Sequence, residues 1–251
     1  VFGHKTIPSR EGGIEIVIEE VYTRLVKRGY YITCFNRKKK NSKNINEFKE
    51  IKIKNVCTYN KKGFAALTSS FFAALKSAFG NYDIVHIHAE GPAFFSFIPK
   101  LFGKKVVCTI HGLDWQREKW EGSLGAKFIK IGEKSAVKFA DQIIVLSSAM
   151  KDYFEKTYSR ETVFIPNGVS KPEIIEPEEI SKKYGLKKDD YILFLARVVP
   201  EKGLGYLVPA FKKLKQIDVV VANGENSAVG NGILPKSADF LFDSEDDCPD
   251  S

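Results

Sequence analysis

The sequence predicts an α/β fold built on a parallel sheet. From residue 14 to residue 165, short apolar runs of strand length alternate with longer segments whose apolar residues recur at helical spacing. Polar residues, including all four histidines, lie at the ends of the predicted strands, with His4 after a truncated first strand. A Pro-rich break at residues 166–177 is followed by a second alternation of the same kind. These observations favour helices packed on both faces of a parallel sheet, with a second α/β unit after the break.

The first alternation supplies five helices and six strands in order. Gly29 and Gly80 end the first two helices, because glycine tolerates the left-handed conformation of a helix C-terminus. The predicted helices cover residues 14–28, 64–79, 92–102, 123–139 and 149–158, and the predicted strands cover residues 31–35, 51–57, 83–88, 106–111, 142–146 and 162–165. On the second helix, the apolar side chains expected in the core are Phe71, Phe72, Leu75 and Phe79.

The break divides the chain into predicted domains. Residues 1–170 form a complete Rossmann-like domain, and residues 171–222 begin a second domain. Within the second domain we predict helices at 178–184 and 204–215 and strands at 191–196 and 218–222. Residues 223–251 are acidic and show no periodicity, so we expect a divergent, disordered tail.

Charge is distributed unevenly along the chain. The net charge is +8, yet residues 218–251 hold eight acidic residues and one Lys, so residues 1–217 carry +15. Such a basic body favours anionic partners, including nucleotide phosphates and an anionic membrane surface. A solvated Lys-rich face explains any single run, such as residues 38–40, equally well. Nucleic-acid binding ranks last and is not expected, because no aromatic residues are interleaved in the Lys runs.

Cysteine usage and the lack of targeting patterns predict a cytoplasmic protein. The four cysteines are widely spaced without a C-x-x-C pattern, and Cys34 and Cys108 lie in apolar runs, so reduced thiols are expected. No signal-peptide pattern opens the chain, and no run of 18 apolar residues is present.

Candidate site residues gather where the predicted strands end. Ligands of open parallel sheets lie at the carboxyl ends of strands, and His86, His88 and Glu90 close one strand while His111 and Asp114 follow the next. The histidine pair could serve zinc, but no third and fourth ligand stand at standard spacing, so no metal is expected.

A second candidate lies in the second unit. Arg197 follows the strand at 191–196, and Lys202 lies in the turn before the next helix. Arginine and helix N-termini both bind phosphate oxygens, so this segment predicts a phosphate-binding site. A surface ion pair is the alternative explanation.

Four motifs resemble the family-four, retaining, nucleotide-sugar glycosyltransferases of GT-B fold. They are S-R-E-G-G-I-E, T-I-H-G-L-D-W-Q-R-E-K-W, F-I-P-N-G-V and L-A-R-V-V-P-E-K-G-L, in family order from about residue 1 to about residue 215. The second motif is similar to bacterial rhamnosyltransferase-like members that build surface polysaccharides. The resemblance implies a GT-B-like fold with one complete Rossmann-like domain and an incomplete second one.

The resemblance implies roles for individual residues. Gly12 and Gly13 would approach the donor diphosphate, which Arg197 and Lys202 would neutralise as a leaving group. The family usually has Gly at position 196, where this chain has Ala. Ordinary turn glycines remain the alternative for the Gly12–Gly13 pair.

The remaining candidates lie on the side of the sugar and the acceptor. His111 would hold donor hydroxyls or orient the acceptor, and a structural histidine is its alternative. Glu90 is the weaker candidate for a base. Asp114 completes the catalytic candidates, and Arg117 and Lys119 would shape acceptor choice.

The implied function is transfer of a sugar from a nucleoside-diphosphate sugar to a glycan or lipid-linked acceptor, with retention, in polysaccharide biosynthesis. No cofactor is implied, since the nucleotide sugar is a substrate. Peripheral contact with the inner face of an anionic membrane is a further expectation, with the Phe-rich helix at 64–79 as a docking surface for a lipid-linked acceptor.

The last 46 residues depart from the family pattern. The family carries two glutamates separated by seven residues that grip the sugar and the ribose, whereas here only Glu225 and Glu245 are present, 20 positions apart. A truncated second domain is therefore expected, with loss of transition-state positioning. The alternatives to an active enzyme are a non-catalytic binding lobe or remnant and, more weakly, a GT-B epimerase.

Overall fold

The computed structural model divides the chain into two compact units, Val1–Val169 and Ser170–Ser251, and each is considered by itself. The structure describes residues 1–9, 12–38, 45–61, 64–116, 122–169, 171, 181–182, 185, 191–196, 202–214, 218–223 and 232–234.

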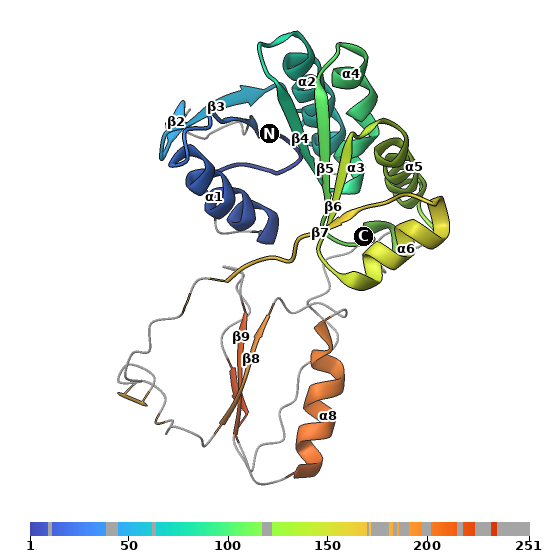
Figure 1. The fold of residues 1–251 in the computed structure, drawn as a ribbon. Helices are drawn as coiled ribbons and strands as arrows, with labels where there is room; N and C mark the ends of the chain where they lie inside the picture. The colour runs from blue at the N-terminus through green and yellow to red at the C-terminus, as the bar shows by residue number, and fades with distance from the viewer. Residues whose placement is uncertain are drawn as a thin grey trace. The chain divides into compact units, whose positions relative to one another are not determined.

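A four-stranded parallel sheet forms the centre of the first unit (Figure 1). His88 pairs with Thr109 across the first two strands, and Ile110 pairs with Val145 across the next two, so the strands end at one edge. The predicted α/β class and parallel sheet are therefore confirmed. In spatial order the strands are β4 (Ile84–His88), β5 (Lys105–Ile110), β6 (Gln142–Val145) and β7 (Val163–Phe164).

The first residues of the chain connect this sheet to a second one. The backbone N–H of Phe2 donates to the carbonyl of His86 at 3.0 Å, and that of His88 donates to Phe2 at 2.9 Å. On the other side, the N–H of Phe35 donates to the carbonyl of Val1 at 2.9 Å. Residues 1–5 thus lie between β4 and a sheet of order β1-β3-β2, composed of β1 (Thr33–Arg37), β3 (Ile51–Val56) and β2 (Glu47–Phe48).

Helices pack around these strands close to their predicted positions. Ser123 and Ser147 cap two of them, since each hydroxyl accepts from the backbone N–H three residues later. The long helices are α1 (Gly13–Val26), α2 (Phe64–Phe79), α5 (Leu124–Phe139) and α6 (Ser148–Tyr158).

The predicted helix at 92–102 is instead three short pieces. They are α3 (Glu90–Ala93), the 3-10 turn η1 (Phe94–Ser96) and α4 (Phe97–Leu101). Pro99 lacks the N–H that would bond the carbonyl of Phe95, so a continuous α-helix is not maintained here.

Helix α2 buries a different face from the one predicted. Its buried side chains are small: Ser69, Ser70, Ala73, Ala74, Ser77 and Ala78. Leu75 packs against the core, but Phe71 and Phe72 are partly exposed and Phe79 is 72% exposed. The prediction that these phenylalanines are core residues is therefore wrong for all three, since Phe71 and Phe72 are 39% and 36% exposed. Small side chains allow the helix to approach its neighbours closely, which pushes the larger ones outward.

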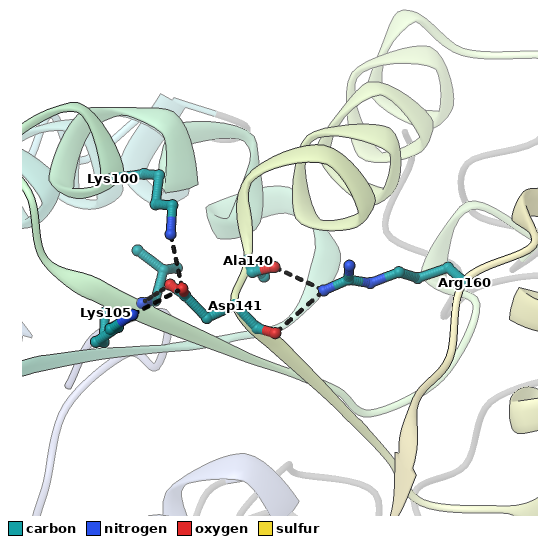
Figure 2. Close-up of polar contacts among 6 residues, drawn as sticks. Lys100, Lys105, Ala140, Asp141 and Arg160 are labelled. Carbon is teal, nitrogen blue, oxygen red and sulfur yellow. Dashed lines mark hydrogen bonds and ion pairs between the residues drawn. The ribbon is translucent and has the colours of Figure 1, made fainter.

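At the amino ends of β5 and β6, charged side chains gather around Asp141 (Figure 2). One carboxylate oxygen of Asp141 accepts from Lys100 Nζ at 2.7 Å, and the other accepts from the backbone N–H of Val106 at 2.8 Å. Lys105 Nζ lies 3.6 Å from the same carboxylate. Arg160 donates to the carbonyl of Ala140 at 2.7 Å. This cluster ties α4, β5 and the turn before β6 together.

The second unit has a three-stranded sheet of order β10-β9-β8. The predicted strands are present as β8 (Tyr191–Ala196) and β9 (Asp218–Asn223), which are parallel, and the predicted helix between them is α8 (Leu204–Leu214). Strand β10 (Gly232–Leu234) pairs antiparallel with β9 and was not predicted. Most of the predicted helix at 178–184, all but residues 181–182, and most of the acidic tail lie outside the described residues.

Two further expectations concern cysteines and membranes. Cys34 and Cys108 are buried free thiols, and burial raises their pKa values to about 11 and about 12. Cys57 is also free but exposed, and Cys248 lies outside the described residues. Among the described helices, none combines the length and apolar character needed to cross a bilayer.

Candidate functional site

Three histidines meet at the carboxyl edge of the four-stranded sheet. His86 and His88 share one face of β4, and their rings stack with centroids 4.5 Å apart. The Nδ1 atom of His88 lies 3.0 Å from Nε2 of His111, which follows β5. His4, the fourth histidine, bonds Asn36 Oδ1 at 2.9 Å instead. The structure thus brings together three of the histidines that the sequence placed at strand ends.

Tyr22 joins this cluster from helix α1 and was not predicted as a site residue. Its hydroxyl lies 2.7 Å from Nδ1 of His86 and 2.8 Å from Nε2 of His88. In the sequence Tyr22 belongs to an apolar stripe with Ile18 and Leu25, which reads as core packing. The only available signal was that a buried tyrosine hydroxyl needs a polar partner.

Burial keeps all four histidines neutral at pH 7. It lowers the pKa of His4 and of His111 to about 4 and that of His86 to about 3. It also lowers the pKa of His88 well below its ordinary value. A neutral imidazole offers one donor and one acceptor, so these rings act as directional hydrogen-bonding groups rather than as cations.

Among the described residues, no group of three or more His, Cys, Asp or Glu side chains is arranged to hold a metal ion. The nitrogens of His86 face Tyr22 and Thr109, the latter at 2.7 Å from Nε2, so this ring has no nitrogen left for a ligand. The expectation that the protein uses no metal remains a prediction.

The Gly12–Gly13 turn begins helix α1. Gly12 is the N-cap residue in extended conformation, and no side chain of the described residues caps the helix. A Cβ on Gly12 would lie 2.1 Å from Oε2 of Glu15, whereas a Cβ on Gly13 would meet no atom of the described residues within 4 Å. The Glu15 carboxylate also accepts from the backbone N–H of Lys5 at 2.8 Å. The turn is therefore open at Gly13 but faces a carboxylate at Gly12.

Glu90 is fully buried. Its Oε2 accepts from the backbone N–H of Asp114 at 2.8 Å, and its carboxyl interacts with that of Glu133. Burial first, and then Glu133, raise the pKa of Glu90 to about 9. Ionised Glu90 would leave its buried Oε1 without a donor, so the carboxyl is neutral at pH 7. Before it, Ala89 has a φ of 74°, a strained conformation for alanine.

Glu133, in helix α5, carries the charge of this pair. Burial alone would raise its pKa, but hydrogen bonds from Glu90, Tyr158, Lys130 and Trp115 outweigh it and lower the pKa. Trp115 Nε1 donates at 3.0 Å and Lys130 Nζ lies 3.1 Å away. Glu133 also accepts from two tyrosine hydroxyls, those of Tyr153 and Tyr158.

Glu133 was not predicted either. With Lys130 three residues before it, the pair resembles an ordinary solvated helix pair. The available signal was Gly132, because a glycine inside a helix often marks close packing. A Cβ at Gly132 would lie 2.1 Å from the carbonyl oxygen of Glu90, which explains how α5 approaches α3 closely enough for the carboxyls to meet.

The other candidates are placed only in part. Asp114 begins the 3-10 turn η2 (Asp114–Gln116) and is partly buried. Lys202, in the second unit, is exposed just before α8. Arg117, Lys119 and Arg197 lie outside the described residues. The roles of all the candidates remain predictions.

A family model and a curated relative agree with the predicted glycosyltransferase family. The model of Glycosyltransferase Family 4 matches residues 11–171. An uncharacterized glycosyltransferase, YqgM, of Bacillus subtilis (strain 168) is 29% identical over 136 residues, which are 54% of this chain and 36% of that relative. A sucrose-phosphate synthase structure from Thermosynechococcus elongatus has a TM-score of 0.44 and 17% identity, covering 61% of this chain and 84% of that chain.

The alignment thus spans little more than a third of the curated relative. The family model, in contrast, matches well over half of this chain and includes the Gly12–Gly13 turn, the histidine cluster and the Glu90–Glu133 pair. The chain therefore belongs to Glycosyltransferase Family 4.

Proposed function

We propose that this chain is part of an enzyme that transfers a sugar, with retention, from a nucleoside-diphosphate sugar to a glycan or lipid-linked acceptor. The observation that carries the proposal is that the family match includes a neutral, partly exposed His111 at the carboxyl edge of the sheet. Parallel sheets bind their ligands at this edge. A neutral imidazole there bonds a sugar hydroxyl without introducing a charge.

The donor diphosphate is assigned to glycines and cations. No atom of the described residues lies within 4 Å of a Cβ placed on Gly13, so among these residues nothing keeps a phosphate from the first N–H groups of α1, which are unsatisfied within the helix. Arg197 and Lys202 would neutralise the leaving diphosphate. The Glu15 carboxylate would repel an anion at Gly12, so diphosphate binding is expected to depend on Arg197 and Lys202.

The acceptor side is assigned to the loop that follows β5. Asp114 is held by Glu90, while Arg117 and Lys119 follow in sequence and would select the acceptor. A rhamnosyltransferase-like role in polysaccharide synthesis at the inner face of the cell membrane, without a metal cofactor, completes the proposal. The excess positive charge of residues 1–217 suits an anionic membrane surface.

Titration calorimetry with UDP, dTDP and GDP on the full chain tests the proposal. We expect one nucleotide to bind, and Arg197→Ala to weaken its affinity by about tenfold or more, because a charge-assisted hydrogen bond to phosphate is lost. Lys202→Ala should have a similar but smaller effect.

Lys151→Ala is the matched control. It removes the same charge from an exposed position of α6 and should leave the affinity unchanged. Failure of all three nucleotides to bind would exclude donor-dependent transfer by this chain and favour the non-catalytic binding lobe. Equal affinity of wild type and Arg197→Ala would exclude the assigned phosphate contact.

A further inference from the structure

We propose that Tyr22 is a positioning residue that, through a hydrogen-bonded chain of histidines, fixes which ring nitrogen of His111 carries its proton. The inference rests on the proposed function, because it takes His111 as the residue that contacts the sugar donor. Its physical basis is a continuous series of contacts that runs from the interior of the sheet to the carboxyl edge.

The chain has four links. Thr109 Oγ1 lies 2.7 Å from Nε2 of His86, and Nδ1 of His86 lies 2.7 Å from the Tyr22 hydroxyl. That hydroxyl lies 2.8 Å from Nε2 of His88, and Nδ1 of His88 lies 3.0 Å from Nε2 of His111. Every ring nitrogen of His86 and His88 therefore has one partner within the chain.

Each group in the chain can donate only one proton. Because the three imidazoles are neutral at pH 7, each has one N–H and one bare nitrogen. The Tyr22 hydroxyl has a single proton but can accept twice, so it either donates to one histidine and accepts from the other, or accepts from both. If it accepted from both, its own buried proton would have no acceptor within the described part of the chain, which is unfavourable. Two arrangements remain, and they run in opposite directions.

The two arrangements give His111 opposite properties. If the protons point inward, His111 donates from Nε2 to His88 and its Nδ1 is a bare acceptor. If they point outward, Thr109 donates to His86, His86 to Tyr22, Tyr22 to His88, and His88 to Nε2 of His111. In that case Nδ1 of His111 carries the proton.

Thr109 selects the outward arrangement. Its side chain is buried, and within the described part of the chain its hydroxyl has His86 as its only hydrogen-bond partner. In the inward arrangement this hydroxyl would accept from His86, and its own proton would be left buried without an acceptor, which is unfavourable. The geometry therefore assigns the proton of His111 to Nδ1, as a hydrogen-bond donor toward an oxygen of the donor substrate.

Packing holds the rings in these orientations. The Tyr22 ring meets those of His86 and His88 edge-on, at 6.0 and 5.9 Å between centroids. On the backbone side, a Cβ at Gly3 would lie 2.1 Å from the carbonyl oxygen of His88, so residues 1–5 leave no room for β4 to shift. Ring flips that would interrupt the chain are thereby opposed.

Long-range proton–nitrogen NMR of the full chain with ¹⁵N-labelled histidine measures the tautomer directly. The chain has only four histidines, so His4→Gln and His111→Gln suffice to assign the key signals. We expect Nδ1 of His111 to be protonated and Nε2 to be bare. A protonated Nε2 would overturn the assigned direction.

Tyr22→Phe removes the hydroxyl and keeps the ring. Either tautomer of His88 then leaves one buried nitrogen without a partner, so the preference falls and His111 populates both tautomers. We expect its two nitrogen shifts to move toward each other. Transfer should slow by about tenfold at saturating donor with little change in KM, since the hydrogen bond lost is to the reacting sugar. Unchanged His111 nitrogen shifts in this variant would overturn the proposal.

Two further variants make the result decisive. Tyr153→Phe is the matched control, because it removes a hydroxyl that bonds Glu133 in the same unit and should leave His111 unchanged. Thr109→Val removes the terminal hydroxyl with little change in shape, and it should shift the His111 signals in the same direction if Tyr22→Phe does not fold. The NMR result does not depend on transfer, so failure of the proposed function and failure of this inference are distinguishable.

Discussion

The two edges of the sheet in the first unit handle carboxyl groups in opposite ways. At the amino edge, the Asp141 side chain is 28% exposed and its lysine partners, Lys100 and Lys105, are 38% and 73% exposed. At the carboxyl edge, Glu90 and Glu133 are completely buried. The chemical groups are similar at both edges, and solvent access decides how each behaves.

The difference is visible in the pKa values. A hydrogen bond from Lys100 is the main cause that lowers the pKa of Asp141, so this group is charged at ordinary pH. Burial raises the pKa of Glu90 to about 9, so it is neutral beside the charged Glu133. The exposed edge thus uses ion pairs that water competes with, whereas the buried edge surrounds one carboxylate, that of Glu133, with Lys130 and several neutral donors.

Removal of Glu133 should have the largest effect. In Glu133→Ala, Trp115 and two tyrosine hydroxyls lose their acceptor and Lys130 loses its buried partner. We expect the free energy of unfolding to fall by about 3–5 kcal/mol. Urea unfolding followed by tryptophan fluorescence measures it, because both tryptophans, Trp115 and Trp120, belong to the first unit. Glu133→Gln retains one acceptor and should lose less, and a loss below about 1 kcal/mol in the alanine variant would show that the buried network is not stabilising.

The pH dependence of stability comes next in size. The folded-state pKa of Glu90 is about 9, above its unfolded value of 4.5, so the folded protein holds a proton that the unfolded chain releases. Its contribution is complete below pH 4.5 and is lost as the pH rises toward 9. Between pH 7.5 and 8.5, where the unfolded histidines hold few protons, wild type should lose about 1.4 kcal/mol per pH unit from this group.

Glu90→Gln tests that slope. Glutamine still accepts from Asp114 but has no proton to release, so the difference in unfolding free energy between wild type and variant should change by about 1.4 kcal/mol per pH unit over this interval. The measurement is again urea unfolding, repeated at several pH values for both proteins. Parallel curves for wild type and variant would show that Glu90 is already ionised.

The site residues at the carboxyl edge were predicted only in part from the sequence. Histidines at strand ends were placed correctly, because parallel topology fixes where strands end. Tyr22 and Glu133 were missed, since each sits on a helix whose spacing suggests an ordinary role, as core or as a surface pair. Their importance depends on which helix packs over which strand, and local periodicity does not contain that information.

Other differences have the same origin. The predicted helix at 92–102 is divided because of Pro99, and this division could have been predicted from the sequence. The exposure of Phe79 could not be predicted from the sequence. Which face of α2 is buried depends on how closely its Ser and Ala residues approach neighbouring elements. Pairing of β10 with β9 likewise joins segments whose register no short motif encodes.

Loss of the Asp141 charge should have the smallest effect. Asp141→Asn keeps an acceptor for the backbone N–H of Val106 but loses the ion pair with Lys100, so we expect the free energy of unfolding to fall by about 1 kcal/mol or less. Its folded pKa is lowered, so this contribution is present above pH 3.8 and is lost as the pH falls below it. Asp152→Asn, at an exposed position of α6, is the matched control.

Salt separates this effect from that of Glu133. At 1 M salt the screening length falls to about 3 Å, so the difference between wild type and Asp141→Asn should shrink toward zero. The difference between wild type and Glu133→Ala should persist, since its donors and acceptor are shielded from ions. If both differences shrank equally, solvent and ions would reach Glu133, and the contrast between a buried carboxyl edge and an exposed amino edge would be wrong.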